Sequence, residues 1–247
     1  MSADEVSAGP SGAHSWAAEF SALAAALDSA TSRSAALERI VAAGAALLPA
    51  ADVVSISLRR ADGSFLTPAW TAPLAQRLDE LQYLLREGPC VLASRRAGVG
   101  MFESSDLGTD PLVSQWGPAA VLEGVRSALA VGLFAHEDPP RIGAINFFSF
   151  RRGALADADR DAAVVLAAHT AAVLHAYDDA EAAERENANL REALRNRDLI
   201  GQAKGILMER EGIGEDAAFD ILRSVSQRMN VKLSEIARTV TGRHSEI

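Results

Sequence analysis

The sequence predicts an α+β domain with a central antiparallel sheet and flanking helices, followed by a long linking helix and an all-α domain of three helices. Three observations lead to this fold class. Short apolar strands alternate with helical segments over residues 14–176, no Gly or Pro interrupts residues 162–200, and three amphipathic segments follow one another over residues 191–247. A chain of 247 residues has room for one or two domains. We therefore expect two domains joined by a helical linker over residues 177–190.

The front domain, residues 14–176, begins after a leader, residues 1–13, that we expect to be disordered because Ser, Gly, Ala and acidic residues dominate it. Helices are predicted where apolar residues recur at three- and four-residue steps, and strands where short apolar runs lie between turn residues. Residues 61–63 are typical of a hairpin turn, and HEDPPR at 136–141 predicts a polar loop. The predicted helices cover 16–27, 33–48 and 73–85, a short helix starts at 88–90, the strands cover 53–60, 64–70, 127–135 and 142–150, and a long helix opens at Asp157.

Three helices are predicted in the tail, residues 191–247. The first keeps its apolar residues on one side and ends before Gly212, because a glycine just past the last turn stops a helix. Glu215 opens the second, where a negative charge suits the positive end of the helix dipole, and this helix ends near Asn230. Ser234 is the predicted N-cap of the third. Together these helices are just large enough to share one small core.

Charge is unevenly distributed along the chain. The net charge of −9 argues against a nucleic-acid partner, because phosphate binding relies on Lys and Arg. However, residues 1–180 hold 13 basic and 21 acidic residues, whereas residues 191–247 hold 10 basic and 9 acidic ones. Both lysines of the chain, Lys204 and Lys232, lie in the tail. The acidic surplus therefore belongs to the front domain, and the nearly neutral tail remains able to bind nucleic acid.

Cysteine usage and the amino-terminal segment indicate the compartment. Cys90 is the only cysteine, which excludes an internal disulfide framework and a thiolate zinc cluster, and the five His residues are scattered. The amino terminus is acidic and polar and lacks the apolar core of a signal peptide. No apolar run reaches the length of a membrane span. We expect a soluble cytoplasmic protein with no metal site and no membrane partner.

The tail carries a motif that extends over its three predicted helices. The motif consists of Ile200, QAKGILM at 202–208, AF at 218–219, LR at 222–223, NVKL at 230–233 and IA at 236–237. At this spacing the tail resembles the ANTAR domain, an RNA-binding module of bacterial transcription antiterminators. The resemblance implies that the partner is an RNA stem-loop in an mRNA leader. The residues expected to contact RNA are Arg195, Arg197, Gln202, Lys204, Arg223, Lys232 and Arg238. For each of five of these residues a plain solvated surface role is the alternative, namely Arg195, Arg197, Lys204, Arg223 and Arg238.

The front domain carries a second set of motifs. They are EGPC at 87–90, SDL at 105–107, GVRS at 124–127 and IGAINF at 142–147. With these motifs the front domain resembles the GAF domain, in the version that lies upstream of ANTAR domains. The resemblance implies a pocket for a small molecule or for redox sensing on one face of the sheet, and the ligand or cofactor is left unknown. The expected ligand-binding residues are Cys90, Trp116 and Phe147. The alternative is that the cysteine is a small buried hydrophobe and that the aromatic residues belong to the core.

Three function classes compete. The two resemblances together favour a ligand-responsive, RNA-binding antiterminator. The alternative is a DNA-binding regulator, because residues 230–242 also look like the second half of a helix-turn-helix, with Arg238, Thr239 and Arg243 as the groups that could reach base edges. An enzyme is not expected. One cysteine cannot form the intramolecular disulfide that sulfoxide-reducing GAF relatives need, and no Ser-His-Asp, phosphate-loop or paired-carboxylate motif occurs.

The linking helix carries a weak coiled-coil pattern. Its stripe residues advance by fours and threes, the coiled-coil spacing. These residues, called the linker seam below, are Val173, Tyr177, Ala180, Ala183, Asn187, Leu190 and Leu194. A polar Asn in such a seam costs stability but fixes the register of a parallel dimer. We expect a homodimer joined along this helix, and the alternative is that the stripe packs on the front domain of its own chain.

Overall fold

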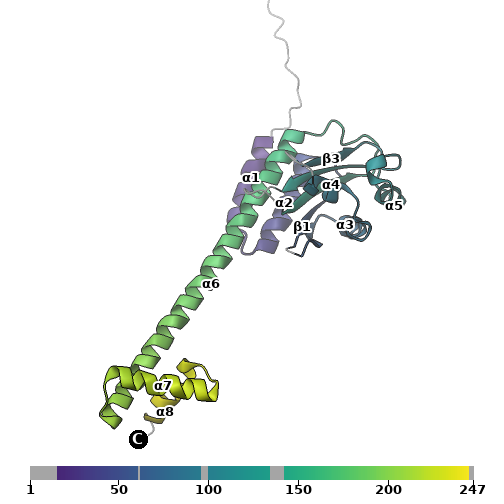
Figure 1. Cartoon of the computed structure of the whole chain (residues 1–247). Coiled ribbons are helices and arrows are strands. Elements are labelled where there is room, and N and C mark those ends of the chain that lie inside the picture. The colour runs from purple at the N-terminus through teal and green to yellow at the C-terminus, as the bar shows by residue number, and fades with distance from the viewer. Residues whose placement is uncertain (1–15, 61, 96–99, 134–141, 245–247) are drawn as a thin grey trace, which may run out of the picture. The chain divides into compact units, whose positions relative to one another are not determined.

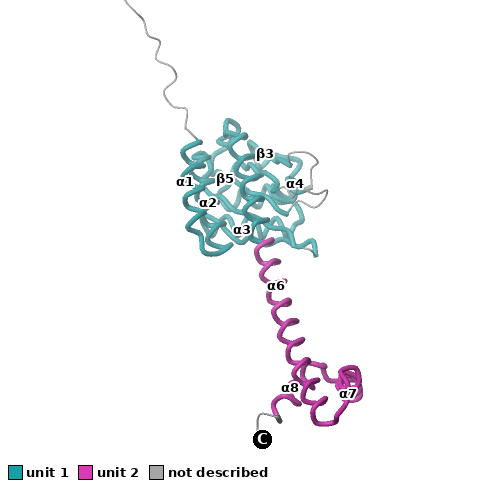
Figure 2. The backbone as a smooth tube through the Cα atoms, turned by 90° about the vertical axis from the view of Figure 1, so that its left-hand side faces the viewer, with its two compact units in different colours: residues 1–177 teal, residues 178–247 magenta. Residues whose placement is uncertain are grey.

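The computed structural model of the chain describes residues 16–60, 62–95, 100–133 and 142–244. The chain forms two compact units, the front unit (1–177) and the tail unit (178–247), each coloured separately in Figure 2. In chain order the elements are α1 (Trp16–Asp28), α2 (Arg33–Leu47), β1 (Val53–Arg59), β2 (Phe65–Trp70), α3 (Pro73–Leu85), α4 (Pro89–Arg95), β3 (Met101–Ser104), the 3-10 helix η1 (Pro111–Val113), α5 (Trp116–Leu122), β4 (Ser127–Leu133), β5 (Gly143–Ser149), α6 (Arg160–Glu211), α7 (Glu215–Met229) and α8 (Leu233–His244). The predicted disordered leader, 1–13, and the predicted polar loop, 136–141, lie outside the described residues.

The front unit is built around an antiparallel sheet of five strands in the order β2-β1-β5-β4-β3. Helices α1, α2 and the first part of α6 cover one face, and α3, α4 and α5 cover the other (Figure 1). The predicted fold class, a central antiparallel sheet with flanking helices followed by a long helix and short helices, is therefore confirmed. Sequence periodicity missed β3, η1 and α5, because these elements are only four, three and seven residues long and α5 contains Gly117 and Pro118.

The two faces of the sheet differ in chemistry. Every residue of β4 and β5 is buried, because helices cover both faces. Side chains alternate along a strand, so Ile145 and Phe147 of β5 face α1, α2 and α6, whereas Ala144, Asn146 and Phe148 face α3, α4 and α5. We call the first the apolar face and the second the polar face.

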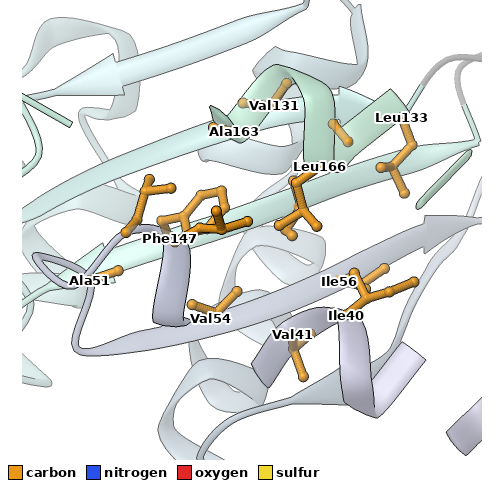
Figure 3. Packing of buried hydrophobic residues seen from close by; sticks show 14 of the residues in the cluster. Ile40, Val41, Ala51, Val54, Ile56, Val131, Leu133, Phe147, Ala163 and Leu166 are labelled. Atoms are coloured by element: carbon orange, nitrogen blue, oxygen red, sulfur yellow. The ribbon is translucent and has the colours of Figure 1, made fainter. Parts of the chain in front are cut away.

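Large aliphatic and aromatic side chains fill the apolar face, as Figure 3 shows. Burying one such side chain stabilises a fold by about 1.5–3 kcal/mol, so this layer contributes substantially to the stability of the front unit. The residues labelled in Figure 3 come from two helices and three strands: Ile40 and Val41 of α2, Val54 and Ile56 of β1, Val131 and Leu133 of β4, Phe147 of β5, and Ala163 and Leu166 of α6, with Ala51 before β1.

Helix α6 is one uninterrupted helix of 52 residues, as the absence of Gly and Pro before residue 201 predicts. It begins at Arg160, three residues later than the predicted start at Asp157. The reason is a cap, because Oδ1 of Asp159 accepts a hydrogen bond from the backbone N–H of Ala162 at 3.0 Å. The helix ends before Gly212, which has a φ of 64° and donates its N–H to the carbonyl of Met208, so the predicted stop is confirmed.

In the tail unit, α7 and α8 pack with the end of α6 around a small core. The fully buried members of this tail core are Ala203, Leu222 and Ala237. Helix α7 ends as predicted, with Asn230 in the left-handed region at a φ of 52°. The predicted N-cap at Ser234 is wrong. Helix α8 begins at Leu233, two residues earlier than a cap at Ser234 would allow, because the carbonyl of Lys232 already accepts the N–H groups of residues 235 and 236.

Candidate functional site

A carboxyl group is buried between α3 and the polar face of the sheet. Asp79 is fully buried, and its Oδ2 accepts hydrogen bonds from the hydroxyls of Ser57 at 3.2 Å and Thr67 at 2.9 Å. Its Oδ1 accepts from the side-chain amides of Gln82 at 2.8 Å and Asn146 at 3.3 Å. Burial raises the pKa of Asp79 to about 7, although hydrogen bonds from neighbouring side chains favour the charged form and lower it. This carboxyl group therefore changes charge near neutral pH.

Asn146 extends this arrangement across the strands. Its Nδ2 also donates to the hydroxyl oxygens of Ser55 at 3.2 Å and Ser57 at 2.9 Å. Its Oδ1 is a buried acceptor with no hydrogen-bond partner among the described residues. Buried polar atoms without a partner are rare in native proteins. The residues of this polar cluster are Ser55, Ser57, Thr67, Asp79, Gln82 and Asn146.

A pocket of about 450 Å³, the front pocket, opens beside the polar cluster. Its lining residues are Asp62, Gly63, Ser64, Phe65, Gln82, Tyr83, Arg86 and Val91. The ring of Tyr83 stacks on Phe65 with 5.5 Å between centroids, and its hydroxyl lies 2.6 Å from Oγ1 of Thr67. Burial raises the pKa of Tyr83, so its phenol stays protonated at neutral pH. The pocket therefore combines a stacked aromatic pair with the guanidinium of Arg86, and the buried Gln82 joins it to the polar cluster.

Residues 87–90, the EGPC motif, form hydrogen bonds with helices that surround the polar cluster. Oε1 of Glu87 accepts both backbone N–H groups at the start of α5, at 2.7 and 2.9 Å. Gly88 has a φ of 135°, and a Cβ there would lie 2.5 Å from Cγ of Gln82, so only glycine fits. Oε1 of Gln82 accepts the backbone N–H of Cys90 at 2.8 Å, which leaves its amide group free to donate to Asp79. The motif therefore positions Gln82 within the cluster.

The three predicted ligand-binding residues do not come together. Cys90 and Trp116 lie on the polar face and Phe147 lies on the apolar face, all fully buried, and none of them lines the front pocket. Trp116 donates its indole N–H to the carbonyl of Leu78 at 3.0 Å. Burial raises the pKa of the Cys90 thiol well above its ordinary value, and the nearby charge of Asp79 raises it further. The thiol is therefore neutral at physiological pH.

Sequence reasoning missed the residues that form the polar cluster, although each one breaks a local pattern. Ser55 and Ser57 alternate within an apolar strand, and Asn146 stands between Ile145 and Phe147 in another. Asp79 lies among the buried positions of α3. Polar residues at positions that the periodicity assigns to the core were the available signal, because a buried polar group must find a hydrogen-bond partner.

In the tail unit, α6 and α7 border a groove of about 550 Å³, the tail groove. Its lining residues are Ala193, Asn196, Arg197, Ile200, Gly201, Lys204 and Phe219. Lys204 forms a short ion pair with Glu215 at the start of α7, and its side chain is 21% exposed. This ion pair lowers the pKa of Glu215.

The seven residues predicted to contact RNA do not form one surface. An α-helix turns about 100° per residue, so Arg197 and Lys204, seven residues apart, share a face, and both line the tail groove. Arg195 lies two residues before Arg197, and Gln202 lies two residues before Lys204. Two residues correspond to about 200° of rotation, so Arg195 and Gln202 share a face roughly opposite to the first. Apart from the partly covered Lys204, all of the predicted residues are exposed: Arg195, Arg197 and Gln202 on α6, Arg223 on α7, Lys232 before α8 and Arg238 on α8.

The linker seam divides into two parts. Val173 packs against the apolar core, and the hydroxyl of Tyr177 donates to the carbonyl of Ala30 at 3.5 Å, so these two belong to the front unit. From residue 180 onward the seam is exposed, and Leu190 and Leu194 are 57% and 59% accessible. None of the described helices is long and apolar enough to cross a membrane. The described residues also contain no group of three or more His, Cys, Asp or Glu side chains that could hold a metal ion.

Family models match both units. A GAF domain model matches residues 30–175, and an ANTAR domain model matches residues 188–240. No curated protein sequence matches the chain at a significant level. The solved GAF domain of a phosphoenolpyruvate-protein phosphotransferase from Coxiella burnetii aligns with a TM-score of 0.54 at 20% identity, covering 70% of this chain and 99% of that one.

Two further solved structures are similar. The GAF domain of a phosphoenolpyruvate-protein phosphotransferase from Acinetobacter reaches a TM-score of 0.51 at 16% identity, covering 67% of this chain and 97% of that one. A domain described as part of a two-component sensor histidine kinase from Sinorhizobium meliloti reaches a TM-score of 0.50 at 17% identity. The match covers 63% of this chain and 99% of that one. At these identities the structures show a shared fold alone.

Proposed function

Because the chain belongs to the GAF domain family and carries an ANTAR domain in its tail unit, we propose that it is a transcription regulator in which the front unit controls RNA binding by the tail unit. GAF domains are sensor domains, and ANTAR domains are RNA-binding domains of antitermination regulators. The proposed target is a stem-loop in a nascent transcript, and the proposed outcome of binding is antitermination. The proposed signal is a small molecule in the front pocket.

The observation that carries this proposal is the ANTAR match over residues 188–240, on a unit where Arg195, Arg197, Arg223, Lys232 and Arg238 are exposed. RNA stem-loops are recognised through unstacked loop bases, with Lys and Arg contacts to phosphates that give orientation and salt dependence. Arg197 and Lys204 lie together at the tail groove and supply such contacts on one side of α6. The acidic surplus of the chain lies within residues 1–180, outside this domain.

Ligand binding is favoured over thiol oxidation as the input to the front unit. Sensor thiols are accessible and have a low pKa, whereas Cys90 is fully buried and its pKa is raised. The front pocket adjoins the polar cluster through Gln82 and Tyr83, which gives a ligand both aromatic and hydrogen-bonding neighbours. Small-molecule sites commonly combine an apolar lining with a few such polar groups.

A homodimer is part of the proposal. The exposed half of the linker seam, from Ala180 to Leu194, leaves two leucines in solvent at coiled-coil spacing. Ala180 and Ala183 bury little area and Asn187 is polar, so the pairing is weak. A weak seam suits a regulator, because a signal can shift an equilibrium only between states of similar free energy.

The test compares an RNA stem-loop with duplex DNA of the same stem sequence in gel-shift assays of the full chain. We expect tighter binding to the RNA and an affinity that falls as salt rises. A preference for duplex DNA would favour the alternative, a helix-turn-helix formed by α7 and α8, which are joined by the three residues 230–232. In that case Arg238→Ala on α8 would reduce binding more than Arg197→Ala on α6.

A further inference from the structure

The tail unit contains a single Phe, Tyr or Trp residue, and it lies outside the tail core. This residue, Phe219 on α7, is 37% exposed and lines the tail groove. The fully buried core of the same unit contains two alanines and one leucine, so its largest apolar ring is not used for packing there. A half-exposed aromatic ring beside a groove is available to stack on a ligand.

Gly201 lines the same groove from α6. Glycine inside a helix costs about 1 kcal/mol relative to alanine, yet a Cβ at Gly201 would meet no heavy atom within 4 Å. Packing within the chain therefore gives no reason for glycine at this position. The missing side chain keeps the groove open.

The groove also carries a positive charge that the chain does not neutralise. Arg197 has no hydrogen-bond or ion-pair partner among the residues that the structure describes, whereas Lys204 is paired with Glu215. A free guanidinium and an exposed aromatic ring at one groove match the two parts of a nucleotide, a phosphate and a flat base.

We propose that the tail groove binds one unstacked base of an RNA loop, with the base stacked on Phe219 and a neighbouring phosphate bound by Arg197. This inference rests on the proposed RNA-binding function. The groove volume of about 550 Å³ lies within the range of about 300–1,000 Å³ that is typical of small-molecule sites, so one nucleotide fits. Loops expose such bases, whereas a continuous duplex keeps them stacked.

A second copy of the chain is the competing occupant, and the charges of the groove argue against it. Continuing the linker seam past Leu194 by threes and fours leads to Arg197, Gly201 and Lys204. Equivalent seam positions face each other in a parallel dimer, so each Arg197 would lie against the same residue of the second copy. Like charges at close range destabilise the pairing. The apolar seam therefore ends at Leu194, and the groove beyond it suits an anionic ligand.

The test uses the full chain and a pool of RNA stem-loops that share one stem and carry randomised loops. The RNA that binds the parent chain most tightly is then measured against four variants by fluorescence anisotropy. Phe219→Ala removes the ring, Phe219→Trp keeps a stacking surface, and Gly201→Leu fills the groove. Ile221→Ala is the matched control, because Ile221 is 40% exposed on the same helix and does not line the groove. Circular dichroism checks helicity, and sedimentation gives the oligomeric state of each variant.

We expect Phe219→Ala and Gly201→Leu to weaken binding by about 5- to 150-fold, the range for stacking one base on an aromatic side chain. Phe219→Trp and Ile221→Ala should bind as the parent does. If the parent binds RNA and all four variants bind equally well, the inference is wrong and the proposed function stands. If no RNA in the pool binds the parent, both are wrong. If Phe219→Ala and Gly201→Leu instead convert a dimer to a monomer, a second copy occupies the groove and the inference is overturned.

Discussion

Lys204 of α6 and Glu215, the first residue of α7, form an ion pair that ties the two helices together beside the tail groove. The lysine side chain is 21% exposed, whereas the glutamate side chain is 69% exposed. The more accessible charge of the pair is therefore negative. A phosphate that approaches Lys204 has to compete with a carboxylate that is already in place.

Removing that carboxylate should strengthen RNA binding. In Glu215→Gln the lysine becomes available to phosphate, so we expect a higher affinity whose gain is largest at low salt, where charges are least screened. The matched control is Asp216→Asn, which removes a charge from the same turn of α7 and leaves the ion pair intact. Anisotropy titrations at several salt concentrations measure both. Equal gains in the two variants would assign the effect to net charge alone.

The same substitution should have a pH-dependent effect on stability. Lys204 lowers the pKa of Glu215 in the folded chain. Its contribution to stability is therefore present above the ordinary pKa of a glutamate and is lost as pH falls through the lowered value. The difference in Tm between the parent and Glu215→Gln should shrink toward acid pH, and a difference that does not depend on pH would remove the ion pair as its cause.

Arg197→Ala should weaken RNA binding and lower the slope of log affinity against log salt by about 1, as expected for the loss of one phosphate contact. Lys204→Ala should also weaken binding, and helicity should be retained in both. Arg195→Ala is the informative comparison, because Arg195 lies on the opposite side of α6 from the tail groove. Unchanged affinity in Arg197→Ala and Lys204→Ala, with helicity intact, would remove the groove from the RNA site.

Asp79→Asn should stabilise the front unit increasingly as pH rises. The folded pKa of Asp79 is about 7 against an ordinary value of 3.8. Its protonation therefore contributes stability that is complete below the ordinary value and is lost as pH rises through 7. Asn fits the same site, because the hydroxyls of Ser57 and Thr67 can accept hydrogen bonds as well as donate them.

Thermal unfolding of the parent and Asp79→Asn from pH 5 to pH 8 measures this effect. The two stabilities should separate by the order of a few kcal/mol across this range. Parallel curves would show that the carboxyl group ionises freely in the folded chain. Asp106→Asn is a suitable control, because this carboxylate is partly exposed and lies outside the polar cluster.

The parent chain should sediment as a dimer at micromolar concentration, and Leu190→Lys/Leu194→Lys should sediment as a monomer. Both leucines are more than half exposed, so the substitutions do not disturb the packing of the single chain. Met229→Lys is the control, since Met229 is 62% exposed on α7 and lies outside the linker seam. A monomeric parent would refute the dimer, whereas a doubly substituted chain that remains dimeric would place the interface elsewhere.

The thiol of Cys90 should not react with a thiol-specific reagent until the front unit unfolds. It is fully buried, and its raised pKa keeps it protonated at neutral pH. Reaction rates in buffer and in denaturant give the comparison. Peroxide should shift the Tm of the parent and of Cys90→Ser equally. A shift confined to the parent would restore a redox role for this residue.

The order of elements was predictable from the sequence because it depends on local patterns. Helix α6 follows from a long segment without Gly or Pro, and the end of α7 follows from Asn230, which tolerates the left-handed conformation. In contrast, α5 contains Gly117 and Pro118 and is held at its start by Glu87, from a distant part of the chain. The contact between Glu87 and the start of α5 cannot be predicted from local sequence patterns.

The candidate sites were less predictable because they depend on register and on helical phase. Ser55 meets Asn146 only because β1 pairs with β5 in one particular register. In the tail, the residue types of the RNA-binding prediction were chosen from a motif, but a motif does not state which side of a helix each residue occupies. The two-residue offset between Arg195 and Arg197 separates them by about half a turn. The spacing of the two residues therefore already places them on different faces of the helix.

Two adjacent residues of strand β5 contact opposite faces of the sheet, the polar face beside the front pocket and the apolar face covered by α6. Asn146 hydrogen-bonds to Asp79 on the polar face, and the next residue, Phe147, points to the apolar face. There Phe147 and Leu166 of α6 both pack against Gly44, where a Cβ would lie 3.3 and 3.2 Å from their nearest atoms. Chains of packed side chains of this kind can carry energetic coupling between two sites. A single peptide unit therefore separates the hydrogen-bond network beside the front pocket from the side chain that packs next to Leu166 near the start of α6.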